Sequence, residues 1–296
     1  MENARIPEGD KQGGNLHRIL FASDLTAYSD RAFDRAVMLA EQYKASLRIL
    51  HVVDSSLLPP QHVKQDIREA KILLEREVRE SGAGKLADTL VKPSSGEADK
   101  VILEEASVLK ADLIVMGLAA HATFSAVFGG TTIDRVIRGA HCPVLTVKTR
   151  PRRDYGSIVV AVDGGEPSRH ALEFALRNFP GARFTVLHIE EKSTATAGAG
   201  KAEQSGGPEI RHQVEDMVRA RCAAAGRPEP GAPDGPTLIT KAGRAKDLLQ
   251  EEIARLDPDL VVLGTHSRTG VTRMFLGSVA ETLLEVLPRD VLVARA

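Results

Sequence analysis

The sequence predicts an α/β protein built from two tandem copies of an open, doubly wound sheet of five parallel strands. Three observations support this fold class. The chain has 296 residues, more than the roughly 100 to 200 residues of a usual single domain. Its two halves repeat one another. Short, nearly continuous apolar runs alternate with helical stretches, a pattern typical of strands buried on both faces of a parallel sheet.

An apolar run that ends in aspartate opens each half. Residues 18–24 and 157–163 match in this way, so that Asp24 and Asp163 are 139 residues apart, and Ser29 and Ser168 keep the same offset. Residues 30–43 then carry apolar side chains at the spacing of an amphipathic helix.

The second apolar run of each half ends in histidine and a branched residue. These pairs are His51–Val52 and His188–Ile189, with the two histidines 137 residues apart. Here a structural imidazole is favoured over a metal ligand.

Downstream, five pairs share an offset of 147 residues, which means that the second half carries ten extra residues. We expect them in loops at 193–208 and 226–236, which are rich in small residues or in Gly and Pro, around one helix. The pairs are Gly96 and Gly243, Asp112 and Asp259, Gly117 and Gly264, Gly130 and Gly277, and Val144 and Val291.

The remaining elements complete the order βαβαβαβαβ in each half. Residues 63–80 and 100–110 predict helices, residues 113–116 and 260–263 predict the fourth strands, and residues 144–147 and 291–294 predict the last strands. Such a fold binds ligands beyond the carboxyl ends of its strands, at the switch in strand order. Asp24 and Asp163, Val52 and Ile189, and Gly117 and Gly264 are expected at those ends.

The domain boundary is expected near residues 148–155. We predict a flexible N-terminal tail over 1–16, a first domain over 17–149, a linker over 150–156 and a second domain over 157–296. The basic residues around Pro151 favour a solvated linker over a nucleic-acid contact.

Composition excludes several classes of partner. The chain is 43% hydrophobic and 27% charged with a formal net charge of −1, so nothing drives it toward nucleic acid or an anionic membrane. The first residues lack the apolar stretch of a secretion signal, and no segment approaches the roughly 20 apolar residues that span a bilayer, which predicts a cytoplasmic location. Cys142 and Cys222 form no CxxC, and no metal-ligand cluster is apparent.

The segment from Gly264 to Ser278 leaves a strand and enters a helix, as a phosphate-binding loop does. A small residue at the strand end lets backbone amides approach an anion, and the helix that begins near Gly277 offers unpaired N–H groups. Ser278 has two candidate roles: its hydroxyl donates to a phosphate, or it caps the helix in a box with Glu281. Thr131 and Asp134 form a similar box in the first half.

These motifs resemble the universal stress proteins, whose ATP-binding members carry Gly-x2-Gly-x9-Gly-(Ser/Thr) in this loop. The second half reads Gly264, Ser267, Gly277 and Ser278 at that spacing, and the first reads Gly117, Ala120, Gly130 and Thr131. The middle glycine is replaced in both. The resemblance covers nearly all of both halves and implies the adenine nucleotide alpha hydrolase-like fold, in the tandem arrangement of two-domain members.

The resemblance also implies ATP or AMP as ligand, with Mg²⁺ if ATP is bound. Asp163 would hold the ribose or adenine, Ile189 would offer backbone groups to the base, and the phosphates would lie among Gly264, Ser267, Gly277 and Ser278. His266 and Arg268 add polar and cationic groups nearby. A weaker site in the first half would use Asp24, Val52, Gly117, Ala120, Gly130 and Thr131. In the alternative interpretation, each aspartate accepts bonds in its own turn and caps the next helix.

Two functional hypotheses follow. The first is a stress-response protein regulated by an adenine nucleotide, mainly in its second half. The alternative is a nucleotide-free scaffold that exposes the apolar first loop to a protein or apolar partner. The sequence contains no P-loop or dinucleotide turn and offers no positioned general base, so we assign no catalytic residues. The resemblance allows at most slow ATP hydrolysis or autophosphorylation on Ser278. We expect the halves to pair through their last strands, with a further homodimer as an option.

Overall fold

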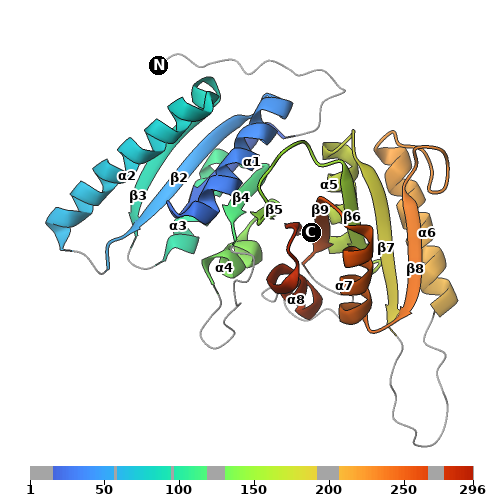
Figure 1. Cartoon of the computed structure of the whole chain (residues 1–296). Coiled ribbons are helices and arrows are strands. Elements are labelled where there is room, and N and C mark those ends of the chain that lie inside the picture. The colour runs from blue at the N-terminus through green and yellow to red at the C-terminus, as the bar shows by residue number, and fades with distance from the viewer. Residues whose placement is uncertain are drawn as a thin grey trace, which may run out of the picture.

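The computed structural model describes residues 16–56, 59–94, 97–118, 131–191, 207–265 and 277–295. Figure 1 shows two halves of the same topology, the first in blue to green and the second in yellow to red. Each has the predicted order βαβαβαβαβ, with one short 3-10 turn added at Ala83–Lys85 in the first half.

The first half contains five strands and four helices. In order they are β1 (Arg18–Ser23), α1 (Ala27–Tyr43), β2 (Ser46–Asp54), α2 (Pro60–Ser81), β3 (Ala87–Ser94), α3 (Ala98–Leu109), β4 (Leu113–Gly117), α4 (Thr132–Gly139) and β5 (Val144–Val147).

The second half repeats this series. Its elements are β6 (Ser157–Val162), α5 (Glu166–Asn178), β7 (Arg183–Glu191), α6 (Gly207–Ala224), β8 (Thr237–Gly243), α7 (Ala245–Leu256), β9 (Leu260–Gly264), α8 (Ser278–Val286) and β10 (Asp290–Ala294). Of the two expected loops, residues 226–236 form turns tied by backbone hydrogen bonds, and most of residues 193–208 lie outside the described part.

The ten strands form one continuous sheet in the order β3-β2-β1-β4-β5-β10-β9-β6-β7-β8. Every neighbouring pair within a half is parallel. The two halves meet where β5 and β10 pair antiparallel, with Leu145 opposite Leu292. The predicted pairing through the last strands is therefore present, and it merges two five-stranded sheets into one.

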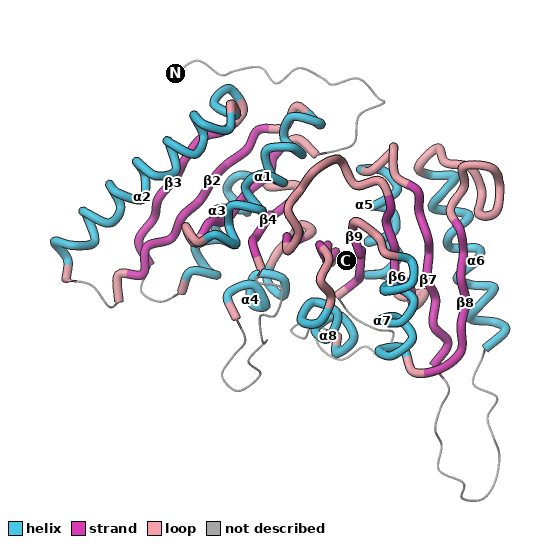
Figure 2. Tube along the Cα trace, viewed as in Figure 1, coloured by secondary structure: helices cyan, strands magenta, loops and turns pink. Residues whose placement is uncertain are grey.

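Helices cover both faces of the sheet, as a doubly wound fold requires (Figure 2). Strand residues alternate between two apolar cores, as Phe21 and Leu20 illustrate. One core packs against α1, α2, α5 and α6, and the other packs against α3, α4, α7 and α8. Both cores run across the seam between the halves.

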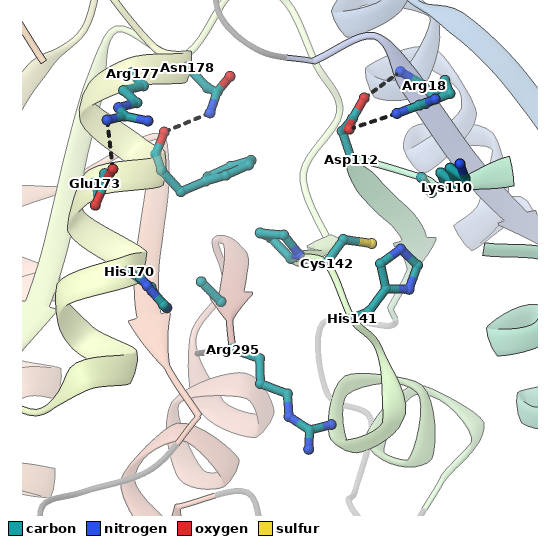
Figure 3. Close-up of a pocket in the computed structure, with 14 residues that line it drawn as sticks. Arg18, Lys110, Asp112, His141, Cys142, His170, Glu173, Arg177, Asn178 and Arg295 are labelled. Carbon is teal, nitrogen blue, oxygen red and sulfur yellow. Dashed lines mark hydrogen bonds and ion pairs between the residues drawn. The ribbon is translucent and has the colours of Figure 1, made fainter. Parts of the chain in front are cut away.

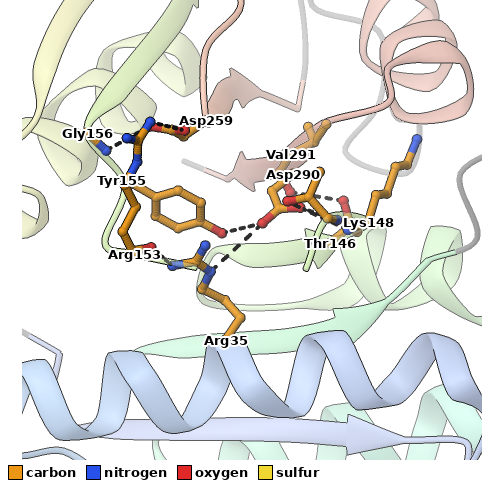
Figure 4. Close-up of polar contacts among 10 residues, drawn as sticks. Arg35, Thr146, Lys148, Arg153, Tyr155, Gly156, Asp259, Asp290 and Val291 are labelled. Carbon is orange, nitrogen blue, oxygen red and sulfur yellow. Dashed lines mark hydrogen bonds and ion pairs between the residues drawn. The ribbon is translucent and has the colours of Figure 1, made fainter. Parts of the chain in front are cut away.

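A buried carboxylate, Asp290, holds the seam together (Figure 4). Its Oδ1 accepts from the backbone N–H of Lys148 and of Thr149 at 2.9 Å each, and from the Thr149 hydroxyl. Its Oδ2 accepts from the Tyr155 hydroxyl at 2.7 Å and lies 3.9 Å from Nε of Arg35 on α1. The guanidinium of Arg35 lies 4.0 Å from the centre of the Tyr155 ring. The start of β10, the connection between the halves and α1 are thereby joined.

The expectation of a solvated linker is wrong at two positions. Lys148 is 3% exposed and Tyr155 is 5% exposed, whereas Arg150, Arg152 and Arg153 are exposed as predicted. The Lys148 ammonium donates to the carbonyls of Leu284 and Leu287 at the C-terminal end of α8, where the helix dipole also favours a cation. The sequence of this basic run does not reveal that the ammonium of its first lysine donates to carbonyls of the other half.

Candidate functional site

The candidate site of the second half lies at the predicted switch in strand order. β6 has β7 on one side and β9 on the other, and the chain leaves these strands in different directions. Asp163 directly follows β6, Gly264 is the last residue of β9, and Gly277 immediately precedes α8. The corresponding positions of the first half are Asp24, Gly117 and the segment before α4.

Asp163 organises the turn between β6 and α5. Its Oδ1 accepts from the backbone N–H of Gly165 at 2.9 Å and from the Ser168 hydroxyl at 2.7 Å. The backbone N–H of Asp163 donates to the same hydroxyl at 3.3 Å. Gly164 between them adopts φ +80°, a conformation that suits glycine. Among the described residues, Oδ2 of Asp163 has no hydrogen-bond donor.

Asp24 makes the same turn in the first half, with more donors. Its Oδ1 accepts from the Ser29 hydroxyl at 2.5 Å and from the N–H and hydroxyl of Thr26 at 2.9 and 2.7 Å. Partial burial acts to raise the pKa of Asp24, but the hydrogen bonds from Ser29 and Thr26 outweigh it and leave this pKa below its ordinary value. Leu25 takes the left-handed conformation that Gly164 holds in the other half.

Both aspartates therefore accept bonds in their own turn with Oδ1, as the alternative predicted. The other part of that alternative is wrong, because the N-caps of α1 and α5 are Thr26 and Gly165 instead of the aspartates. The sequence prediction assigned no role to Ser29 and Ser168, although they repeat at the offset of the aspartates. That shared offset of 139 residues was the signal in the sequence that could have identified the two serines as partners of the aspartates. Each serine is buried in the first turn of a helix and locks the carboxylate to it.

The second strand of each half runs past its neighbour. His51 pairs with the last residue of β1 and His188 with the last residue of β6, so Val52 and Ile189 lie beyond the ends of those strands. The strands continue two residues past the predicted ends, to Asp54 and Glu191. Ile189 thus has no register partner in β6. Each histidine places Nδ1 2.8 Å from a carbonyl of the adjacent strand end, Ser23 or Val162, as expected for structural imidazoles. The expectation holds only in part for His188, whose buried Nε2 has no hydrogen-bond partner among the described residues.

Gly264 and Gly117 allow strands to approach helices closely. A Cβ on Gly264 would lie 2.6 Å from the backbone of Pro167 and Ser168, and one on Gly117 would lie 2.6 Å from the carbonyl oxygen of Tyr28. These contacts are far shorter than a Cβ tolerates. The glycines are consequently required for fold geometry, whatever else they bind, and the sequence interpretation had linked them to phosphate alone.

The loop after β9 is closed at its base. The N–H of Gly277 donates to the carbonyl of Thr265 at 2.8 Å, and the N–H of Thr265 donates to that of Ala294 on β10 at 3.1 Å. α8 then begins at Ser278 with Gly277 as its N-cap, and no side chain caps it. The N–H groups of the first turn of α8 therefore have no side-chain cap among the described residues.

The predicted capping box at Ser278 is wrong. Ser278 is the first helical residue instead of the cap, and its partner Glu281 forms an ion pair at 3.0 Å with Arg138 of the first half. In the first half the box is half formed. The Thr131 hydroxyl accepts from the N–H of Asp134 at 3.2 Å, whereas the Asp134 carboxylate pairs with Arg138. The two helix N-termini therefore differ: one is capped and one is open.

Five predicted site residues lie outside the described part of the chain: Ala120, Gly130, His266, Ser267 and Arg268. The structure therefore brings together Asp163, Ile189, Gly264, Gly277 and Ser278 in the second half, and Asp24, Val52, Gly117 and Thr131 in the first. In the described part, no three His, Cys, Asp or Glu side chains lie together as a metal site, and no helix is long and apolar enough to cross a membrane.

Chemically, the second site offers a carboxylate oxygen, a strand that extends past the end of its neighbour and an open helix N-terminus. Such a set recognises a polar molecule with an anionic group.

Comparison with known proteins gives a consistent result. The model of the universal stress protein family matches the chain twice, over residues 15–148 and 154–295. A universal stress protein of Methanocaldococcus jannaschii is 30% identical over 156 residues, which cover 49% of this chain and 89% of that protein. The crystal structure of a universal stress protein from Archaeoglobus fulgidus covers 94% of this chain and 96% of its own with a TM-score of 0.68 at 17% identity. One from Pseudomonas aeruginosa covers 95% and 94% with a TM-score of 0.62 at 22% identity.

Proposed function

The chain belongs to the universal stress protein family, as a tandem member, and on that premise we propose that it is a cytoplasmic stress-response protein regulated by an adenine nucleotide, ATP or AMP, bound mainly in its second half. We take residues 17–149 and 157–296 as its two domains. The ligand would act by changing a surface or the arrangement of the domains, without dedicated catalysis.

The open N-terminus of α8 carries this proposal. A helix N-terminus that lacks a side-chain cap keeps donors for an anion, and its dipole favours negative charge by about 0.3 to 1 kcal/mol. The exposed Ser278 at the first helical position adds a hydroxyl. These groups fit the phosphate end of a nucleotide.

Asp163 and Ile189 fit the other end of the ligand. Oδ1 of Asp163 is fixed by Ser168 and Gly165, so its Oδ2 is held in a defined direction without a described donor of its own. A ribose hydroxyl or an adenine amino group would donate to it. The backbone of Ile189, which lies past the end of β6, would bond the edge of the base. His266, Ser267 and Arg268 would complete the phosphate contacts, with Mg²⁺ accompanying ATP.

The first half is proposed as the weaker site. Thr131 already occupies one donor of α4, and Oδ1 of Asp24 serves three donors from Thr26 and Ser29. The cap at Thr131 reduces what this first-half set can offer an anionic group, whereas Oδ2 of Asp24, like that of Asp163, has no donor among the described residues. The set consists of Asp24, Val52, Gly117, Ala120, Gly130 and Thr131.

Calorimetry tests the proposal with matched variants. AMP and Mg-ATP are titrated into the full chain, into Asp163→Asn and into Asp24→Asn. Asparagine keeps an oxygen for the turn and removes the charge. We expect saturable binding in the unchanged chain, a loss of about tenfold in affinity, or about 1.4 kcal/mol, for Asp163→Asn, and little change for Asp24→Asn. No binding of either nucleotide at millimolar concentration would sink the proposal.

A second candidate function is a nucleotide-free scaffold that binds a protein or apolar partner. The buried seam at Asp290 and the single ten-stranded sheet favour it, because they hold the two halves as one rigid platform. This candidate predicts that nucleotides leave the thermal midpoint unchanged while a partner raises it.

A further inference from the structure

One arginine of the first half, Arg138, joins the two helices that follow the candidate phosphate loops. Its Nε lies 2.9 Å from a carboxylate oxygen of Asp134 in the first turn of α4. Its Nη2 lies 3.0 Å from a carboxylate oxygen of Glu281 in the first turn of α8. The helices α4 and α8 lie side by side at the seam (Figure 1). The Arg138 guanidinium therefore contacts one carboxylate of each half.

The two carboxylates occupy equivalent positions of the repeat. Asp134 and Glu281 are separated by 147 residues, the offset that the glycine pairs of the two loops share. The position equivalent to Arg138 in the second half is Glu285, which carries the opposite charge. A single guanidinium, supplied by the first half, thus pairs with both equivalent carboxylates.

Reciprocal contacts at the other ends of α4 and α8 hold these helices in place. Lys148 directly follows β5 and donates to carbonyls at the end of α8. Arg295 directly follows β10, again 147 residues further along the chain, and donates to the carbonyl of Arg138 in the last turn of α4. Figure 3 shows the Arg295 side chain reaching from the end of β10 toward α4. These backbone contacts fix Arg138 relative to α8 in addition to its own ion pairs.

Glu281 lies where a negative charge opposes an anionic ligand. It follows Ser278 by three residues, and side chains at that spacing are neighbours on a helix surface, with Cβ atoms about 5 to 6 Å apart. The N-terminus of α8 is the proposed position of the nucleotide phosphates, so an uncompensated carboxylate at Glu281 would repel them. The Glu281 side chain is 38% exposed, and solvent therefore screens part of this repulsion.

We infer that Arg138 is a positioning residue of the nucleotide site in the second half: its guanidinium neutralises Glu281 and thereby preserves the affinity of the site for phosphate groups. Arg138 acts through Glu281 and is not itself a ligand of the nucleotide. The inference rests on the proposed function and adds to it, because it makes the first half a contributor to binding in the second.

Calorimetry with adenosine, AMP and Mg-ATP separates this electrostatic role from a structural one. The three ligands share the base and the ribose but differ in phosphate charge. At about 0.1 M salt, where charges interact over about 10 Å, we expect Arg138→Gln to weaken the binding of AMP and of Mg-ATP by about fivefold. The affinity for adenosine should stay unchanged, because adenosine has no charge for Glu281 to repel. An equal loss for all three ligands would overturn the inference.

Two further variants test the charge directly. The double variant of Arg138→Gln with Glu281→Gln removes the repelling carboxylate and should restore the AMP affinity to within about twofold of the unchanged chain. Arg138→Gln also leaves the buried Asp134 carboxylate without this partner, which lowers stability. The double variant of Asp134→Asn with Arg138→Gln removes that buried charge and should show the same fivefold loss for AMP as Arg138→Gln. Circular dichroism checks that each variant is folded at the temperature of the titration.

Arg135→Gln is the matched control. Arg135 also lies on α4 and forms an ion pair at 2.9 Å, but its partner Asp99 belongs to the first half. This variant should leave the AMP affinity unchanged. The inference is overturned if Arg135→Gln weakens AMP binding as much as Arg138→Gln, or if Glu281→Gln fails to restore it. Absence of nucleotide binding to the unchanged chain would overturn the proposed function and this inference together, whereas undiminished AMP binding in Arg138→Gln would overturn this inference alone.

Discussion

Removal of one buried hydroxyl tests the role of the seam between the halves. In Tyr155→Phe the ring remains between Phe179, 5.7 Å away, and the Arg35 guanidinium, so packing and the cation–π contact persist. The change deletes only the hydroxyl that donates to Oδ2 of Asp290 at 2.7 Å. Asp290 is 0% exposed, and Oδ2 would keep only the Arg35 guanidinium at 3.9 Å.

The expected cost follows from the charge and burial of the acceptor. A hydrogen bond to a charged group contributes about 1.5 to 3 kcal/mol, and a buried acceptor that loses its donor forfeits that contribution without water to replace it. We therefore expect Tyr155→Phe to lower the free energy of unfolding by about 2 kcal/mol. With a urea dependence of about 3 kcal/mol per molar, the midpoint moves down by roughly 0.7 M.

Urea unfolding followed by circular dichroism measures this shift. Tyr28→Phe is the control, because Tyr28 is 49% exposed and its hydroxyl has no bonding partner among the described residues. The control should change the free energy of unfolding by less than about 0.5 kcal/mol, as surface substitutions do. Equal midpoints for Tyr155→Phe and Tyr28→Phe would refute the view that Asp290 fastens the halves through Tyr155.

Three further predictions follow from individual contacts. Gly264→Ala should lower the free energy of unfolding, measured in urea, by about 1 to 3 kcal/mol, because the new Cβ would lie 2.6 Å from the backbone of α5. Gly181→Ala, where no atom lies within 4 Å of the new Cβ, should leave it unchanged, and equal effects would contradict the close approach. Thr131→Ala should lower the free energy of unfolding by about 1 kcal/mol because α4 loses its N-cap, whereas Ser278→Ala should leave thermal stability unchanged. A comparable loss at both positions would show that Ser278 is a cap. Burial lowers the pKa of Lys148 to about 8 from an ordinary 10.5, so the unfolded chain binds more protons between these values, and this residue's contribution to stability should rise from pH 8 to 10.5. The difference in thermal midpoint between the unchanged chain and Lys148→Met should follow that rise, and a pH-independent difference would contradict it.

The sequence was sufficient for the fold because the signals were local or repeated. Several signals mark positions within one half: Asp24 and Asp163 follow an apolar run, and Gly117 and Gly264 end the fourth strands. The constant offset of 147 residues shows that the halves repeat. The family resemblance agrees with what those positions show. Even the last strands, predicted to associate, pair as expected.

Side-chain contacts between the halves could not be predicted from the sequence. The pattern of Ser278 and Glu281 is a sound local capping box, but Arg138 from the other half takes the Glu281 carboxylate, and Gly277 becomes the cap. Lys148 belongs to a basic run, yet it enters the interior because the carbonyls at the end of α8 accept from its ammonium.

Native mass spectrometry of the full chain with AMP or Mg-ATP tests most directly the proposal that one half binds a nucleotide and the other mainly supports it. We predict a single adenine nucleotide per chain, whose occupancy at a fixed ligand concentration is retained in Asp24→Asn and reduced in Asp163→Asn, in keeping with a tenfold weaker affinity. Two nucleotides per chain with equal affinity, or none at saturating concentration, would contradict the asymmetry between an open helix at Ser278 and a capped helix at Thr131.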